Sequence, residues 1–129
     1  MSGWLAQYQQ KEETPKPVQL SPTVLFFQGI RKGNLEQCKQ QLAHIDKATA
    51  VDGRGNPPSM VALDQHMWHV PPLSDKWARI IEFLGEKGFD LNRPNRHGWT
   101  VLQVCARNRD NVCPHLLTTI KKYVGNYHP

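Results

Sequence analysis

The sequence DGRGNPP at residues 52–58 returns as NRHGWTV at residues 95–101, and both copies follow the frame D/N-x-x-G-x-[TP]. Self-similarity of this kind is typical of repeat proteins, in which each unit is one helical hairpin that stacks on its neighbours. The two copies therefore predict two equivalent joints between helical units.

Helix signals before the first joint predict a helical hairpin. Ser21-Pro22 offers an N-cap followed by a proline at the first helical position, and a helix is expected to run to Lys32. Gly33-Asn34 then ends it. The next segment, a second helix, carries one apolar stripe made of Leu35, Cys38, Leu42 and Ile45.

Two further segments show the same apolar spacing. Ser74-Asp75 is predicted to cap a helix that stops at Gly88, with a stripe made of Trp77, Ile80, Ile81 and Leu84. The last helix is expected to hold Pro114 in its first turn and to end at Gly125-Asn126, with a stripe made of Val112, Leu116, Ile120 and Tyr123. These patterns predict an all-α chain.

Two helix ends resemble those of the ankyrin-repeat family. The segment FLGEKGFDLN at 83–92 is similar to the family's L-L-x-x-G-A-D-V-N, and GIRKGNLE at 29–36 to its A-A-x-x-G-N-L-E turn. The resemblance covers about residues 24–123 and implies an ankyrin-like solenoid of about three helical hairpins. We expect a cap at 21–51, an interrupted repeat at 52–92 and a C-terminal cap at 93–125.

Residues 1–20 are too polar to offset the entropy of ordering, so we expect a flexible N-terminal arm. Trp4, Leu5 and Tyr8 form its one adhesive feature, and at helical spacing they could dock on the body or on a partner.

The chain departs from the family pattern in two ways. The family's T-P-L-H reads PPSM at 57–60 and TVLQ at 100–103, and the loss of the histidine predicts irregular or shortened joint loops. Gly55 and Gly98 lie 43 residues apart, against a period of about 33. The extra residues are expected at about 66–74, where HMWHVPPLS forms an insertion that either contacts a partner or folds back over the core.

Composition indicates one domain of 129 residues with a modest net charge of +5. The three cysteines, Cys38, Cys105 and Cys113, form no C-x-x-C pair and favour a reducing compartment. Neither a signal peptide nor a stretch long enough to span a bilayer is evident, so a cytoplasmic location is expected, with the nucleus possible and secretion into a host cell left open.

The family resemblance also implies which residues face a partner. Transferred residue by residue, the concave positions are Arg31, Lys32, Gly53, Arg54, Asn56, Asp64, Gln65, Arg96, His97, Trp99, Arg107 and Asn108. Five of these twelve residues are basic and one is acidic, so an acidic or phosphorylated protein surface would complement them. With the insertion included, the predicted partner-binding residues are Arg31, Lys32, Arg54, Trp68, Arg96, His97, Trp99 and Arg107.

Three alternatives to this binding function stay open at the level of sequence. The arginines could be an ordinary solvated face, or they could follow a nucleic-acid backbone while Trp99 stacks on a base. A small Cys/His enzyme would use Cys105 with His115, or Cys38 with His44, but no nucleotide-binding, hydrolase or metalloprotease motif is present.

A metal site is disfavoured by spacing. Cys105, Cys113 and His115 do not follow the paired spacing of structural zinc sites, and His66-x-x-His69 has no acidic third ligand nearby. We therefore predict a non-catalytic module with no metal and no cofactor.

Overall fold

The computed structural model describes residues 20–124, and the predictions for the N-terminal arm and for Gly125-Asn126 lie outside this range. The described chain is all-helical and contains no strand. Its elements are α2 (Pro22–Lys32), α3 (Leu35–Gln41), η1 (Leu42–His44), α4 (Pro58–Trp68), α5 (Asp75–Glu86), α6 (Val101–Arg107), η2 (Arg109–Asn111) and α7 (Pro114–Val124).

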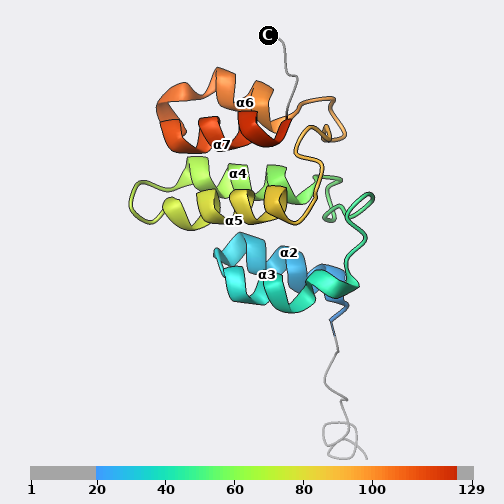
Figure 1. Cartoon of the computed structure of the whole chain (residues 1–129). Coiled ribbons are helices and arrows are strands. Elements are labelled where there is room, and N and C mark those ends of the chain that lie inside the picture. Colours follow the sequence, from blue (N-terminus) through green and yellow to red (C-terminus); the bar gives the residue numbers. More distant parts are fainter. Residues whose placement is uncertain (1–19, 125–129) are drawn as a thin grey trace, which may run out of the picture.

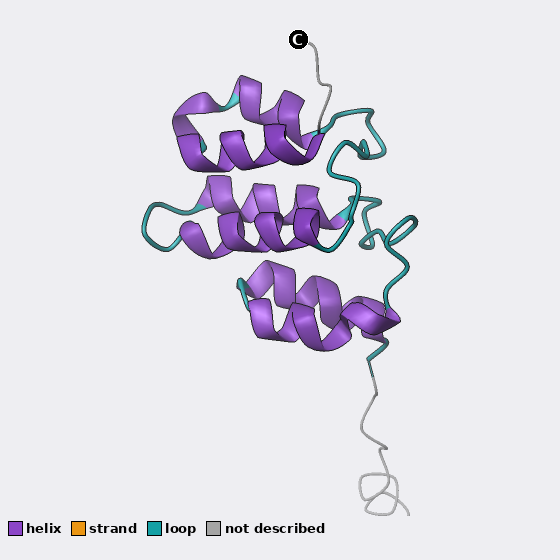
Figure 2. Ribbon diagram, in the orientation of Figure 1, coloured by secondary structure: helices purple, strands orange, loops and turns teal. Residues whose placement is uncertain are grey.

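The six α-helices form three pairs that stack as layers: α2 with α3, α4 with α5, and α6 with α7 (Figure 1). Helix α4 contacts both α2 and α6, while α5 contacts both α3 and α7. Figure 2 shows the long connections between layers on one side of the stack and the α4–α5 loop on the other. The middle layer therefore has a neighbour on each side.

The first hairpin has the predicted ends. Ser21 Oγ accepts a hydrogen bond from Val24 N at 3.2 Å, and Pro22 follows at the first helical position. Gly33 adopts a φ of 70°, which lets the N–H of Asn34 reach Gly29 O at 2.8 Å. Asn34 Oδ1 then accepts from Gln37 N at 3.1 Å and caps α3, so one two-residue turn ends one helix and starts the next.

Helix α5 begins where expected, at Asp75, but the predicted capping by the Ser74 side chain is wrong. Ser74 makes no side-chain capping hydrogen bond, and its hydroxyl is buried without a hydrogen-bond partner among residues 20–124. Its backbone is already helical, because turns begin at Val70, and an N-cap side chain needs an extended backbone to fold back on the helix. The other end is as expected, since Gly88 has a φ of 90° and Phe89 N donates to Leu84 O at 3.0 Å.

The core runs through all three layers. Trp77 on α5 donates its indole N–H to the carbonyl of Ile30 on α2 at 2.7 Å. Phe26 on α2 stacks on Phe89, with ring centroids 5.8 Å apart. Between the middle and third layers, Gly85 on α5 lies against the ring of Tyr123 on α7. These contacts fix the layers relative to one another.

The insertion is divided between helix and loop. Helix α4 ends at Trp68, 13 residues after Gly55, whereas α6 ends at Arg107, nine residues after Gly98. Helix α4 is therefore longer by four residues. The remaining insertion residues form the loop at 69–74. Trp68 is 78% exposed and Val70 is 75% exposed, so the alternative in which these side chains cover the core is wrong, although Met67 is half-buried against it.

Candidate functional site

Both joint loops have the same hydrogen-bond pattern. In the first loop, Asp52 Oδ1 accepts from the N–H groups of Arg54 and Asn56, both at 2.9 Å. Two backbone bonds complete it, from Gly55 N to Asp52 O and from Asp52 N to Asn56 O, both at 3.0 Å. Gly55 has a φ of 82°, a backbone conformation in which glycine carries no steric penalty.

The second loop repeats this pattern with asparagine in place of aspartate. Asn95 Oδ1 accepts from His97 N at 2.9 Å and from Trp99 N at 3.1 Å, and the two equivalent backbone bonds are present at 2.9 Å. The expectation of irregular joint turns is therefore wrong. The side chains of Asp52 and Asn95 stiffen these turns without a contribution from the missing histidine.

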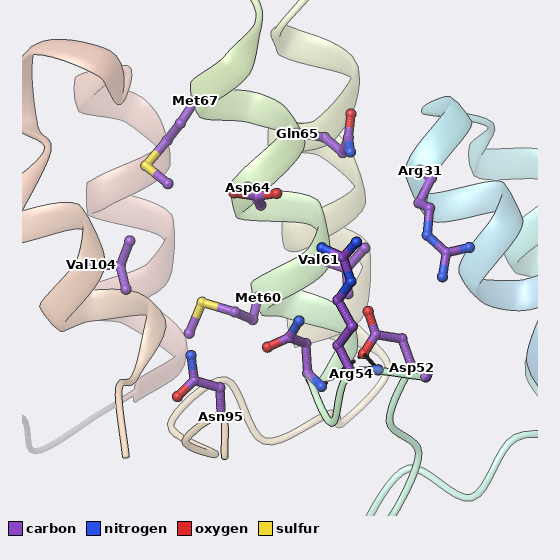
Figure 3. A pocket seen from close by; sticks show the side chains of 12 residues that line it. Arg31, Asp52, Arg54, Met60, Val61, Asp64, Gln65, Met67, Asn95 and Val104 are labelled. Carbon is purple, nitrogen blue, oxygen red and sulfur yellow. Dashed lines mark hydrogen bonds between the residues drawn. The ribbon is translucent and has the colours of Figure 1, made fainter. Parts of the chain in front are cut away.

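A groove of about 930 Å³ lies between the joint loops and one face of the stack. Its floor is α4, and α2, α6 and both joints contribute its walls (Figure 3). A pocket that spans several elements and combines apolar and polar groups is the usual form of a binding site. This groove is therefore the candidate site.

The groove has two chemically different halves. Met60, Met67 and Val104 gather on the side of α6, as Figure 3 shows. Arg31 and Arg54 lie on the side of α2, together with Asp52 and Gln65. An occupant with one apolar and one polar face would match this division.

The charged groups of the groove are not paired with one another. The ion pair found within residues 20–124 is an exposed one between Lys39 and Glu36, with Nζ and Oε1 3.5 Å apart. Arg31, Arg54, Asp52 and Asp64 therefore keep their charges available to an occupant, and the groove itself holds as many acidic as basic side chains.

A smaller hollow of about 270 Å³ adjoins the groove at the third layer. It is lined by Asn95, Trp99, Val104, Arg107 and Asn108, of which Asn95 and Val104 also line the groove. The guanidinium carbon of Arg107 lies 4.4 Å from the centre of the Trp99 ring, within the range of a cation–π contact. The aromatic anchor expected at Trp99 thus holds one of the predicted arginines.

The eight predicted partner-binding residues do not all meet. Arg31 and Arg54 line the groove, and Trp99 and Arg107 line the hollow. Arg96 and His97 are exposed on the second joint, where Arg96 Nε lies 3.3 Å from His97 Nε2, and the Arg96 side chain packs beside Gly55. Lys32 is exposed and, like Arg96 and His97, lines neither cavity.

Trp68 lies apart from the groove. It lines another hollow of about 350 Å³, formed by the end of α4, the 69–74 loop and the residues around η2. Met67, which belongs to the insertion, lines both this hollow and the groove, so the two surfaces adjoin at Met67.

The apolar half of the groove was absent from the predicted site. Met60, Met67 and Val104 are the residues concerned. A signal existed, since α4 carries apolar residues on more than one face, and a helix with one neighbour on each side needs such a distribution.

Cys38, Cys105 and His66 are buried in the packed interior. Burial raises the pKa of both the Cys38 and the Cys105 thiol to about 12, and these thiols are therefore protonated and weak nucleophiles at neutral pH. His66 is 1% exposed; its Nδ1 lies 2.9 Å from Ser74 O and its Nε2 accepts from Cys113 N at 3.2 Å. Because a carbonyl can only accept, the proton is on Nδ1.

His69 stacks on Trp77 with ring centroids 4.3 Å apart, and its Nδ1 lies 2.7 Å from Gln65 O. No group of three or more potential metal ligands comes together in the described part of the chain.

Comparisons of this chain with protein-family models, with curated proteins and with solved structures gave no match. Between Leu20 and Val124, no helix has both the length and the apolar character that crossing a bilayer requires.

Proposed function

We propose that this chain is a non-catalytic protein-interaction module, an adaptor, targeting subunit or antagonist, whose groove receives a segment of a partner protein with acidic or phosphorylated groups. The observation that carries the proposal is the groove itself: all three layers line it, and its charged side chains form no ion pairs with one another. Unpaired charges beside an apolar strip offer both specificity and buried area to a polypeptide.

The finer description of the fold belongs to the same proposal. Two joint loops with the same hydrogen bonds, each leading into the first helix of a stacked pair, support an ankyrin-like solenoid in which the joints present side chains beside a concave face. Such arrays hold partners on a preformed surface because each unit is fixed by its neighbours.

The insertion supplies a second contact in this proposal. Trp68 and Val70 are the most exposed of the large apolar side chains described, with Leu73 beside them at 46%. Exposed tryptophan is favoured at protein interfaces because it buries a large area at low entropic cost. A partner long enough to pass from the groove to the 69–74 loop would cover both surfaces.

A nucleic-acid backbone fits the groove less well than a polypeptide does. A nucleic-acid strand carries a phosphate at every nucleotide and needs a continuous basic surface, whereas the groove holds Asp52 and Asp64 beside its two arginines. A catalytic function is likewise disfavoured by the raised pKa of the Cys38 and Cys105 thiols.

The test is affinity capture from native cell extract with mass spectrometry. It compares the wild type with the double variant Arg31→Glu/Arg54→Glu, which reverses the two arginines that line the groove, and with the matched control Arg79→Glu, an exposed arginine on α5 that lines neither the groove nor the hollow. We expect the wild type and the control to capture the same protein and the double variant to lose it while keeping its helical circular dichroism. Unchanged capture by the double variant, or capture of nucleic acid that weakens steeply with salt, would overturn the proposal.

A further inference from the structure

The two joint loops differ in the one atom that their fold leaves free. In each loop, Oδ1 of the first residue accepts two backbone N–H groups, at Asp52 in one loop and at Asn95 in the other. Because both partners are donors, the amide of Asn95 can have only one orientation, with its oxygen in the turn. The remaining atom is an anionic oxygen at Asp52 and an N–H₂ donor at Asn95.

The free nitrogen of Asn95 is directed at the groove. Figure 3 shows it pointing up from the joint toward the end of the Met60 side chain, and it makes no hydrogen bond with the residues described. The two bonds to Oδ1 hold the whole amide plane. Asn95 therefore presents a pre-oriented donor at the place where the groove meets the smaller hollow.

A second donor lines the same hollow. The guanidinium carbon of Arg107 lies over the Trp99 ring, 4.4 Å from its centre. The planar N–H groups of a guanidinium match the two oxygens of a carboxylate. Val104 and the Trp99 ring give the hollow apolar walls, and Asn108 Nδ2 is occupied by Val104 O at 2.9 Å.

We infer that the hollow between Asn95, Trp99 and Arg107 is a carboxylate-binding subsite. This inference rests on the proposed function and specifies which group of the partner binds. The occupant is an aspartate or glutamate side chain, or the C-terminal carboxylate, of the partner polypeptide. One guanidinium and one neutral amide balance a single negative charge, whereas a phosphomonoester carries about two at neutral pH and needs a further cation. The subsite therefore prefers a carboxylate to a phosphate.

The experiment uses small probes, so that it does not depend on the partner. The full chain, labelled with ¹⁵N, is titrated separately with N-acetylglutamate α-amide, N-acetylglycine and inorganic phosphate. We expect saturable shifts of the Trp99 indole, Asn95 side-chain amide and Arg107 Nε signals with at least one carboxylate probe, with a dissociation constant on the order of millimolar. The carboxylate that binds more tightly identifies the source, a side chain or a chain end.

Three variants test the assignment. Asn95→Asp keeps the turn, because Asp52 forms the same turn in the first joint, but it replaces the donor with a negative charge; we expect at least about tenfold weaker carboxylate binding. Arg107→Lys keeps the charge and loses the planar fork, with an expected loss of about threefold. Arg79→Ala is the matched control and should bind like the wild type.

Three results would each overturn the subsite. They are the absence of shifts with both carboxylate probes, equal affinity of Asn95→Asp and the wild type for the carboxylate, and tighter binding of phosphate than of carboxylate. The two proposals fail separately. Carboxylate binding with undiminished partner capture by the double variant would contradict the proposed function alone, and lost capture without carboxylate binding would contradict the subsite alone.

Discussion

The middle layer is joined to its two neighbours in different ways. Toward the first layer, side chains reach across and donate to backbone carbonyls: Trp77 to Ile30, and, at the connections, Arg93 to Ala50 and Thr49 and Lys47 to Lys87. Toward the third layer, the contacts are a buried histidine and a close approach between Gly85 and Tyr123.

The difference indicates how each interface responds to a substitution. Long donors at the edge of the first interface tolerate small shifts because solvent can replace a lost bond. The interface with the third layer depends on fit, since a buried imidazole and a glycine leave no room for adjustment. The groove crosses both interfaces, so damage to either one should alter the shape of the groove.

The largest effect is expected for His66→Ala. The change removes the acceptor of Cys113 N–H and the donor to Ser74 O and leaves a cavity, so we expect a loss of about 3–4 kcal/mol in the free energy of unfolding. Urea unfolding measures the loss, and hydrogen exchange should show α6 and α7 opening before α2 and α3. The exposed His115→Ala is the control, and equal effects of the two variants would refute the bridging role of His66.

Next comes Trp77→Phe, which tests the first interface. It removes the indole N–H that donates to Ile30 O and part of a buried ring, with an expected loss of about 2 kcal/mol. Trp68→Phe, at a side chain that is 78% exposed, should change stability by less than about 0.5 kcal/mol. Urea unfolding measures both variants. Similar losses in the free energy of unfolding for Trp77→Phe and Trp68→Phe would show that the Trp77 indole does not hold the first interface.

Gly85→Ala returns to the interface with the third layer and should have a smaller net effect. A Cβ at this position would lie 2.6 Å from the Tyr123 ring, and the resulting strain exceeds the better helix propensity of alanine by about 1 kcal/mol. In Tyr123→Ala the ring is gone, and the same substitution should then stabilise. A double-mutant cycle of Gly85→Ala and Tyr123→Ala, followed by thermal unfolding, tests this explanation. Additive effects on stability would show that the Tyr123 ring does not cause the strain.

The smallest effect is expected for Arg93→Ala. Its guanidinium donates to Ala50 O at 2.9 Å in a part-buried bond and to Thr49 O at 3.0 Å in an exposed one, where solvent can replace it. We expect a loss of about 0.5 kcal/mol, with faster exchange confined to the connections. Arg79→Ala serves as the control, and a loss as large as that of His66→Ala would place the connections among the main supports of the stack.

The sequence predicts several helix ends and the positions of the two joints because their signals act over three or four residues. Ser21, Gly33 and Gly88 each determine a local backbone geometry that the structure shows as expected. Ser74 has an equally good local signal, but the loop before it already turns as a helix does, and the cap is lost.

What the sequence does not predict depends on neighbours that are distant in the chain. His66 bonds to residues 8 and 47 positions away, and its bridging role has no local pattern. Trp68 and Trp77 are both tryptophans beside apolar residues, and only the packing of α5 against the first layer makes one of them core. The apolar half of the groove is likewise set by what α6 leaves uncovered on α4.

The joint loops assign shape and electrostatics to different atoms of one side chain. At Asp52 and at Asn95 the same oxygen maintains the turn, so the choice between aspartate and asparagine leaves the backbone unchanged and alters only what the surface presents. A single substitution can therefore exchange a cation-attracting position for an anion-attracting one without a compensating change in the core. Each joint is a place where the charge presented beside the groove can be altered, by mutation or by design, without loss of the turn.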